Sequence, residues 1–538
     1  MTRTRTAHRR LFSLVLVGLL ITTAAIAAPR LPGFFTNNMV LQREIAVPVW
    51  GWADPGEVVT VAFGGQSVSA TADAKGKWMA KLAAMPASGE GRVLNVSSPG
   101  NNPITVANVV VGEVWICSGQ SNMEWALNAV KNSKEEIAAA NYPLIRHVKI
   151  GHVTADVPLA DVKSQWQISS PGTAGGFTAV GYFFARKLHD ELKVPIGLIG
   201  SNWGGTRVEP WTPPVGFRSV PELADIAKRV DATLPGTIGG QASYMQYLTD
   251  VENWLPKAKT AVNHGENPAP CPTPPRIGAS HQDPTRIYNA MIHPLVPYAI
   301  RGAIWYQGES NGGEGVSYFH KKQALIGGWR KLWNQGDDAT GPGQAFPFYF
   351  VQLANFQKAN DNPAGGDGWA KFREAQRQCL TIPNVGMAVI TDIGEARDIH
   401  PRNKQDVGLR LALWALAKDY GQKDLVYSGP LYKSHAVEGS AIRVRFDSAG
   451  SGLMVGKKEG LSPTAEDAAG SLKRFAVAGA DKQWHWADAV IDGDSVVVSS
   501  PDVAAPVAVR YAFSMNPLGC NLYNREGLPA SPFRTDDW

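Results

Sequence analysis

The fold of this 538-residue chain is decided at the stretch VWICSGQSNMEW, residues 114–125. Its first half is apolar and is typical of a buried β-strand. Gly119 permits a tight turn, and a helix-compatible segment begins at Ser121. The pattern therefore predicts that Ser121 lies at the carboxyl end of a strand, where backbone N–H groups can face a developing oxyanion.

From about residue 109 to residue 422, apolar strands alternate with amphipathic helices. Helical periodicity is seen at 177–192 and at 402–420, where apolar residues recur every three to four positions. This alternation predicts an α/β domain with a largely parallel sheet covered by helices on both faces. The candidate buried strands are 113–117, 144–150, 195–200, 299–306, 346–353 and 386–391.

The two ends of the chain have a different sequence pattern from the middle. Residues 28–108 and 423–538 contain short apolar strands separated by turn clusters, which predicts an N-terminal β-sandwich-like region and a C-terminal β-rich region. The α/β domain between them is expected to span 109–422. Proline-rich and helical fragments interrupt it at 213–285, and we interpret this segment as an insertion near the catalytic face.

Residues 1–27 resemble a secretory signal peptide. Four arginines precede an apolar run, and Ala25-Ile26-Ala27 offers a small-residue cleavage site. An N-terminal membrane anchor is the alternative, although the run is short for a span. Without this segment the formal charge falls from +5 to about +1. We therefore expect a secreted or periplasmic protein that binds neither nucleic acid nor, after cleavage, a membrane.

Four cysteines follow the signal segment. They are not arranged as C-x-x-C, and no His/Cys cluster has the spacing of zinc ligands, so no metal is expected. One or two disulfides are possible in an oxidising compartment, and the sequence does not choose among the pairings. Cys117 lies in the apolar strand and is expected to be a buried thiol. The four are Cys117, Cys271, Cys379 and Cys520.

A serine hydroxyl needs a base to act as a nucleophile. Asp398 and His400 follow a predicted strand and are two residues apart, so the carboxylate can orient the imidazole and leave its other nitrogen free. Asp392 is the alternative orienting acid, and His293 is the main rival base.

Two further strand ends are expected at the same edge of the sheet. One strand runs into SNWGGT at 201–206, where a glycine N–H can approach a substrate closely. Another runs into QGESN at 307–311, which offers an amide donor. Because open α/β sheets bind ligands beyond the carboxyl ends of their strands, these segments, Ser121 and His400 can share one crevice.

Four blocks of the sequence together resemble the sialate O-acetylesterase family of the SGNH hydrolases. They are GQSNMEW (119–125), SNWGGTRVEPW (201–211), WYQGESN (305–311) and DIHP (398–401). The resemblance covers nearly the whole chain after the signal segment. It implies an SGNH-hydrolase-like (flavodoxin-like) three-layer sheet, with the β-sandwich regions as accessories.

The resemblance also implies roles for individual residues. Ser121 would be the nucleophile, His400 the base and then the acid, and Asp398 its orienting carboxylate. The N–H groups of Ser121 and of Gly205 or Gly204, with the Gln307 amide, would form the oxyanion hole. The wider superfamily has Asn at the position of Gln307, which leaves the geometry of that donor open.

The family's usual substrates are O-acetyl groups on sugars such as sialic acid, and similar enzymes act on acetylated hemicelluloses such as xylan or xyloglucan. The reaction needs no cofactor. The partner expected for this chain is therefore an acetylated carbohydrate. A carbohydrate-binding protein with a vestigial esterase site is the alternative.

Several side chains near the blocks have two interpretations. Glu124 and Glu309 can act as acid–base groups or support the site loops through hydrogen bonds, and we favour support. Arg207 can bind a substrate carboxylate or pair with Glu209. The tryptophans of the blocks can stack on sugars or fill the core; they are Trp125, Trp203, Trp211 and Trp305.

Overall fold

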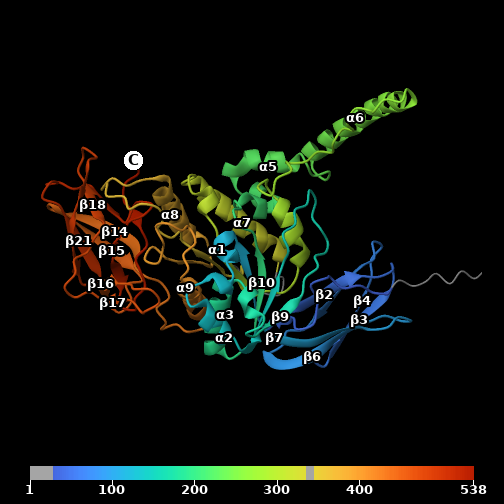
Figure 1. Cartoon of the computed structure of the whole chain (residues 1–538), viewed down its shortest axis with the longest axis horizontal. Helices are drawn as coiled ribbons and strands as arrows, with labels where there is room; N and C mark the ends of the chain where they lie inside the picture. Colours follow the sequence, from blue (N-terminus) through green and yellow to red (C-terminus); the bar gives the residue numbers. More distant parts are fainter. Residues whose placement is uncertain (1–27, 335–344) are drawn as a thin grey trace, which may run out of the picture.

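The computed structural model describes residues 28–334 and 345–538, so the predicted signal segment lies outside the described residues. Six parallel strands have the spatial order β13-β12-β11-β7-β10-β8, and β9 (Trp166–Ser169) pairs antiparallel at the edge. The sheet lies at the centre of the molecule, where β7, β9 and β10 are labelled in Figure 1. The parallel strands are β7 (Ile104–Gly119), β8 (Tyr142–Lys149), β10 (Ile196–Asn202), β11 (Gly302–Tyr306), β12 (Phe348–Val351) and β13 (Val385–Ala388).

Helices cover both faces of this sheet. Helices α3 (Ala179–Leu192) and α9 (Lys404–Lys418) pack together on one face, while α7 (Ser317–Trp333) and α8 (Gly368–Gln378) lie on the other. Strand β7 is apolar on both sides because its side chains alternate between these layers: Trp115 and Cys117 face α3 and α9, and Ile116 joins the opposite core. The predicted three-layer α/β fold is confirmed.

Strand β7 is longer than expected. Its first half pairs with β6 (Ser88–Ser97) and β1 (Val40–Gln42), and its second half pairs with β10 and β11. The boundary predicted between residues 108 and 109 therefore falls inside a continuous strand. The N-terminal region and the catalytic sheet share this strand.

The N-terminal region consists of short antiparallel strands, as its texture predicts. A two-stranded ribbon of β2 and β5 packs beside the β4-β3-β6 sheet. In β5 every second side chain is buried, which is the pattern of a strand with one face on a core. These strands are β2 (Val47–Trp52), β3 (Val58–Phe63), β4 (Gln66–Thr71) and β5 (Lys77–Leu82).

The C-terminal region is also β-rich and encloses its own apolar core. Its strands form the antiparallel sheets β14-β15-β21-β20, β17-β16-β23 and β19-β18-β22-β24. Their bounds are β14 (Leu431–Glu438), β15 (Ala441–Asp447), β16 (Leu453–Lys457), β17 (Ala465–Glu466), β18 (Phe475–Ala478), β19 (Trp484–Trp486), β20 (Asp488–Asp492), β21 (Ser495–Ser499), β22 (Ala508–Tyr511), β23 (Leu522–Asn524) and β24 (Phe533–Arg534).

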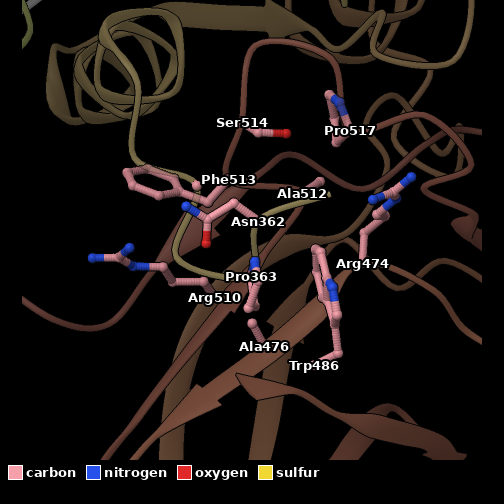
Figure 2. A pocket seen from close by; sticks show the side chains of 11 residues that line it. Asn362, Pro363, Arg474, Ala476, Trp486, Arg510, Ala512, Phe513, Ser514 and Pro517 are labelled. Carbon is pink, nitrogen blue, oxygen red and sulfur yellow. The ribbon is translucent and has the colours of Figure 1, made fainter. Parts of the chain in front are cut away.

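A buried arginine joins this region to the catalytic domain. Arg373 of α8 donates to the carbonyl oxygens of Leu353 at 2.8 Å and Ser514 at 2.7 Å, one from each region. Figure 2 shows a small pocket nearby, with Arg474 and Trp486 on one side of it. Its volume of about 10 Å³ has room for about one water molecule. A larger pocket of about 370 Å³ also lies between the two regions, lined by Asp392 on one side and Tyr523 on the other.

The predicted insertion is mainly helical. It contains α4 (Pro214–Arg218), α5 (Ala224–Asp231) and α6 (Ile238–Asn263), and α6 projects away from the body of the molecule (Figure 1). The last residues of the insertion reach the catalytic edge, where the Gln282 amide donates to the Gly205 carbonyl at 2.8 Å. Among the described residues, no helix is both long and apolar enough to cross a membrane.

Candidate active site

The end of β7 delivers Ser121 to the edge of the sheet. Gly119 has a φ of +133°, and a Cβ atom there would lie 2.2 Å from the carbonyl oxygen of Tyr306 on β11. Only glycine can therefore make this turn. Ser121 then opens the short helix α1 (Ser121–Glu124). Since β10 and β11 end beside β7, the three blocks that follow these strands meet at one edge, as predicted.

The structure brings Ser121, His400 and Asp398 together. Ser121 Oγ lies 2.9 Å from His400 Nε2, and His400 Nδ1 lies 3.1 Å from Asp398 Oδ1. Ser121 and His400 are 279 positions apart in the chain, so the fold brings them together. The indole of Trp125 stacks on the imidazole with ring centroids 4.7 Å apart. The arrangement is that of a nucleophile, a base and an orienting carboxylate.

The protonation states suit proton transfer. Burial by itself would raise the pKa of Asp398, but hydrogen bonds from the backbone N–H and the ring of His400 outweigh it and hold that pKa below its usual value. Burial lowers the pKa of His400, and the Asp398 charge offsets this only in part. The imidazole is therefore neutral at pH 7. Its Nδ1 hydrogen faces Asp398, so Nε2 can accept the Ser121 proton.

The two alternative residues are engaged elsewhere. Asp392 is buried and accepts two hydrogen bonds from Arg410, at 2.6 and 2.7 Å. The His293 ring bonds the carbonyl oxygen of Leu159 at 2.8 Å. Neither contacts the Ser121–His400 pair, so the structure assigns the orienting contact to Asp398.

Two glycines lie beside the nucleophile. A Cβ atom on Gly204 would be 3.4 Å from Ser121 Cβ, but the Gly204 N–H already donates to Glu124 Oε2 at 2.8 Å. Gly205 has a φ of +72° and open space around it. Within the described part of the chain, no acceptor takes the N–H of Ser121 or of Gly205. Both N–H groups are therefore available to donate to an oxyanion.

The role expected for Gln307 does not fit its contacts. Its side chain is fully buried, and Nε2 donates both hydrogens, to Asn311 Oδ1 at 2.7 Å and to the Thr206 carbonyl at 3.2 Å. The Gln307 side-chain oxygen is also engaged, since it accepts from Tyr318 Oη at 3.0 Å. Gln307 therefore ties the β10 and β11 loops together and has no free donor for an oxyanion.

The acidic and basic side chains of the blocks have supporting contacts. Glu124 holds Gly204 as described above, and Glu309 Oε1 accepts from Asn122 Nδ2 at 2.5 Å. Arg207 pairs with Glu209 at 3.3 Å and also with Glu314, so its guanidinium is held within the protein. The supporting interpretation of these residues agrees with the geometry.

The four tryptophans divide into two classes. Trp211 and Trp305 are fully buried and pack edge to face in the core, 6.1 Å apart. Trp125 and Trp203 are partly exposed at the site. Trp203 stacks with His281 from the end of the insertion at 4.9 Å, an aromatic contact that sequence reasoning missed. It also stacks with a histidine after β8, His152, at 4.5 Å.

The four cysteines are free thiols, and Cys117 is buried as predicted. In the described part of the chain, no group of three or more His, Cys, Asp or Glu side chains is arranged to hold a metal ion.

Sequence reasoning also missed Asn122 and Lys404. Lys404 Nζ bonds Asn122 Oδ1, and Asn122 Nδ2 donates to the carbonyl oxygen of Ile399, next to His400, at 3.0 Å. Both side chains are buried. The sequence contained a signal for both: Asn122 directly follows Ser121, and Lys404 lies four positions after His400.

No protein-family model matches the chain. It is 30% identical to the sialate O-acetylesterase of Mus musculus over an alignment of 548 positions, and the alignment covers 94% of each protein. The chain belongs to the sialate O-acetylesterase family. The sialate O-acetylesterase of Homo sapiens is 32% identical over 75% of this chain and 73% of its own.

Solved structures agree with this family membership. The crystal structure of a carbohydrate acetylesterase from Xanthomonas citri superposes with a TM-score of 0.77 and 37% identity, over 95% of this chain and 100% of that one. The resemblance inferred from the four blocks is thus confirmed. As a member of the sialate O-acetylesterase family, the chain is a carboxylic ester hydrolase.

Proposed function

We propose that this protein removes acetyl groups from sugar hydroxyls through an acetyl-enzyme on Ser121. The observation that carries the proposal is the 2.9 Å contact between Ser121 Oγ and His400 Nε2, with Asp398 on the far side of the ring. Sugars are supported as substrates by the relatives, which include a carbohydrate acetylesterase and sialate O-acetylesterases.

Acylation begins when Ser121 Oγ attacks the acetyl carbonyl and His400 Nε2 takes its proton. Asp398 stabilises the imidazolium that forms. The free N–H groups of Ser121 and Gly205 bind the oxyanion of the tetrahedral intermediate. His400 then returns the proton to the departing sugar oxygen, which leaves acetate esterified to Ser121.

Deacylation repeats the sequence with water. His400 removes a proton from water, the hydroxide attacks the acetyl carbonyl, and the proton passes to Ser121 Oγ as acetate leaves. Every proton is carried by the protein's own residues. We propose acetylated sialic acid or an acetylated hemicellulose, such as xylan or xyloglucan, as the sugar. We also propose export through residues 1–27, which makes the enzyme secreted or periplasmic.

The test is acetate release by Ser121→Ala. Loss of the nucleophile should lower kcat by about 10⁴-fold or more on p-nitrophenyl acetate and on the three acetylated glycans. Ser118→Ala is the matched control, because Ser118 is buried in the same strand and its hydroxyl has no partner within the described residues. Ser118→Ala should keep its activity, and both variants should keep the wild-type circular dichroism. Undiminished acetate release by folded Ser121→Ala would refute the mechanism.

A further inference from the structure

A chain of three polar side chains lies behind the catalytic histidine. Asn122 is its centre: the side-chain oxygen accepts from Lys404 Nζ, and Nδ2 donates to Glu309 Oε1 at 2.5 Å and to the Ile399 carbonyl at 3.0 Å. Asn122 follows the nucleophile Ser121 directly, and Ile399 precedes His400. The amide therefore links the helix of the nucleophile to the loop of the base.

The buried position of Lys404 is costly and calls for an explanation. Its side chain is fully buried at the start of α9, with Nζ 4.9 Å from the centre of the Tyr306 ring. Burial lowers the pKa of Lys404 to about 7, against the opposing charges of Glu309, Asp398 and Glu395. Burial likewise raises the pKa of Glu309, although the Asn122 bond and the Lys404 charge oppose it. Buried groups with shifted pKa values cluster at functional sites, and structural ion pairs also produce them, so the contacts of Lys404 decide its role.

We propose that Lys404 is a positioning residue for catalysis. Lys404 fixes the Asn122 amide and so holds His400 against Ser121. The charge of Lys404 also disfavours protonation of the imidazole before the reaction. The proposal rests on the acetyl-enzyme mechanism above. It assigns a role to a residue that touches neither the substrate nor the reacting atoms.

The chemistry of the lysine fixes the orientation of the amide. The Lys404 amino group carries N–H hydrogens in both its protonated and its neutral form, and it donates to the side-chain oxygen of Asn122. The Nδ2 hydrogens then point the other way, towards Ile399 and Glu309. Without the lysine the amide could rotate and lose its bond to the Ile399 carbonyl. The His400 loop would then be free to drift from Ser121, and a 1 Å displacement can cost about 10²-fold in rate.

The charge of Lys404 acts on the same base. The charged groups that face it are Glu309 from the β11 loop and Asp398 and Glu395 from the His400 loop, with the Tyr306 ring from β11. The groups that act on His400 are Asp398, which favours the imidazolium, and Lys404, which adds to the effect of burial in lowering the pKa of His400. Removing the lysine charge should raise that pKa, so the base would become protonated at a higher pH.

The experiment is the pH dependence of kcat/KM for Lys404→Met on p-nitrophenyl acetate. We expect about a tenfold loss on the alkaline plateau. We also expect the acid limb to move to higher pH, so that the ratio of kcat/KM at pH 8 to that at pH 6 rises by about twofold or more. The double variant Lys404→Met/Glu309→Gln removes both buried charges and protects against misfolding, and it should show the same shift of the acid limb.

Lys322 offers a matched control. It is also a fully buried lysine whose pKa burial lowers to about 7, but it lies on the α7 face of the sheet, with Nζ 4.2 Å from the centre of the Phe350 ring. Lys322→Met should leave the pH profile unchanged. If folded Lys404→Met and the double variant both keep the wild-type profile, or if Lys322→Met moves it equally, the inference is wrong. Failure of the acetyl-enzyme mechanism would be recognised separately, by undiminished activity of Ser121→Ala.

Discussion

The two sides of Ser121 are built differently. On the acid–base side, Asp398 and His400 of the His400 loop (residues 395–403) contact each other, and His400 is at hydrogen-bond distance from Ser121. On the oxyanion side, the glycine loop (residues 203–206) has one N–H occupied by Glu124, and the neighbouring Gln307 amide is occupied as well. In the proposed mechanism, proton transfer is therefore preorganised, while the oxyanion relies on the backbone N–H groups of Ser121 and Gly205.

Among the variants that test this comparison, Asp398→Asn should have the largest effect on kcat. An amide cannot stabilise the imidazolium or hold the same tautomer, so kcat should fall by about 10³–10⁴-fold with the fold retained. Asp392→Asn is the matched control: its partner is the buried Arg410, so it should lower the melting temperature and change kcat by less than about tenfold. If the two variants exchanged these effects, the orienting carboxylate would be Asp392.

An intermediate effect is expected for Glu124→Ala, which releases the Gly204 N–H and the glycine loop. Because Gly205 must stay aligned with the oxyanion, kcat should fall by about 10–10²-fold. Glu124→Gln keeps an oxygen for the Gly204 N–H and should retain kcat within about fivefold. Steady-state kinetics on p-nitrophenyl acetate separate the two. A Glu124→Ala variant as active as wild type would show that the hydrogen bond between Glu124 and the Gly204 N–H is dispensable.

The smallest effect on rate is expected for Gln307→Leu. The change leaves the Thr206 carbonyl and Asn311 Oδ1 without a buried donor, which should cost about 1–3 kcal/mol of folding free energy. The melting temperature should fall while kcat stays within about fivefold of wild type. A loss of about 10²–10³-fold in kcat would instead identify Gln307 as an oxyanion donor, and the comparison between the two sides would fail.

The fold was accessible from the sequence because strand–helix alternation is a local pattern, and the trio of Ser121, His400 and Asp398 was accessible because four sequence blocks resemble a known family. Strand–helix alternation gave the parallel sheet, and the carboxyl ends of its strands located the blocks around Ser121. The pairing partner of Gln307 was not accessible, since it depends on where Asn311 and Thr206 lie. The same holds for Asn122 and Lys404, whose contacts cross 282 residues of sequence.

The extent of β7 was the other feature hidden from the sequence. Turn clusters and texture locate a change of architecture near residue 108, but they do not reveal that hydrogen-bonding partners on the two halves of one strand belong to different sheets. The local sequence pattern predicts which type of element a segment forms. Whether a strand continues depends on its pairing partners in the folded sheet, which the pattern does not contain.

That shared strand means that the accessory region cannot be treated as a detachable module. A fragment starting at residue 109 would cut through β7 and strip β1 and β6 from the strand that ends at the nucleophile. Recombination between relatives would have to exchange the N-terminal region and the first catalytic block together. The N-terminal strands and the esterase are thus one unit of inheritance as well as one unit of structure.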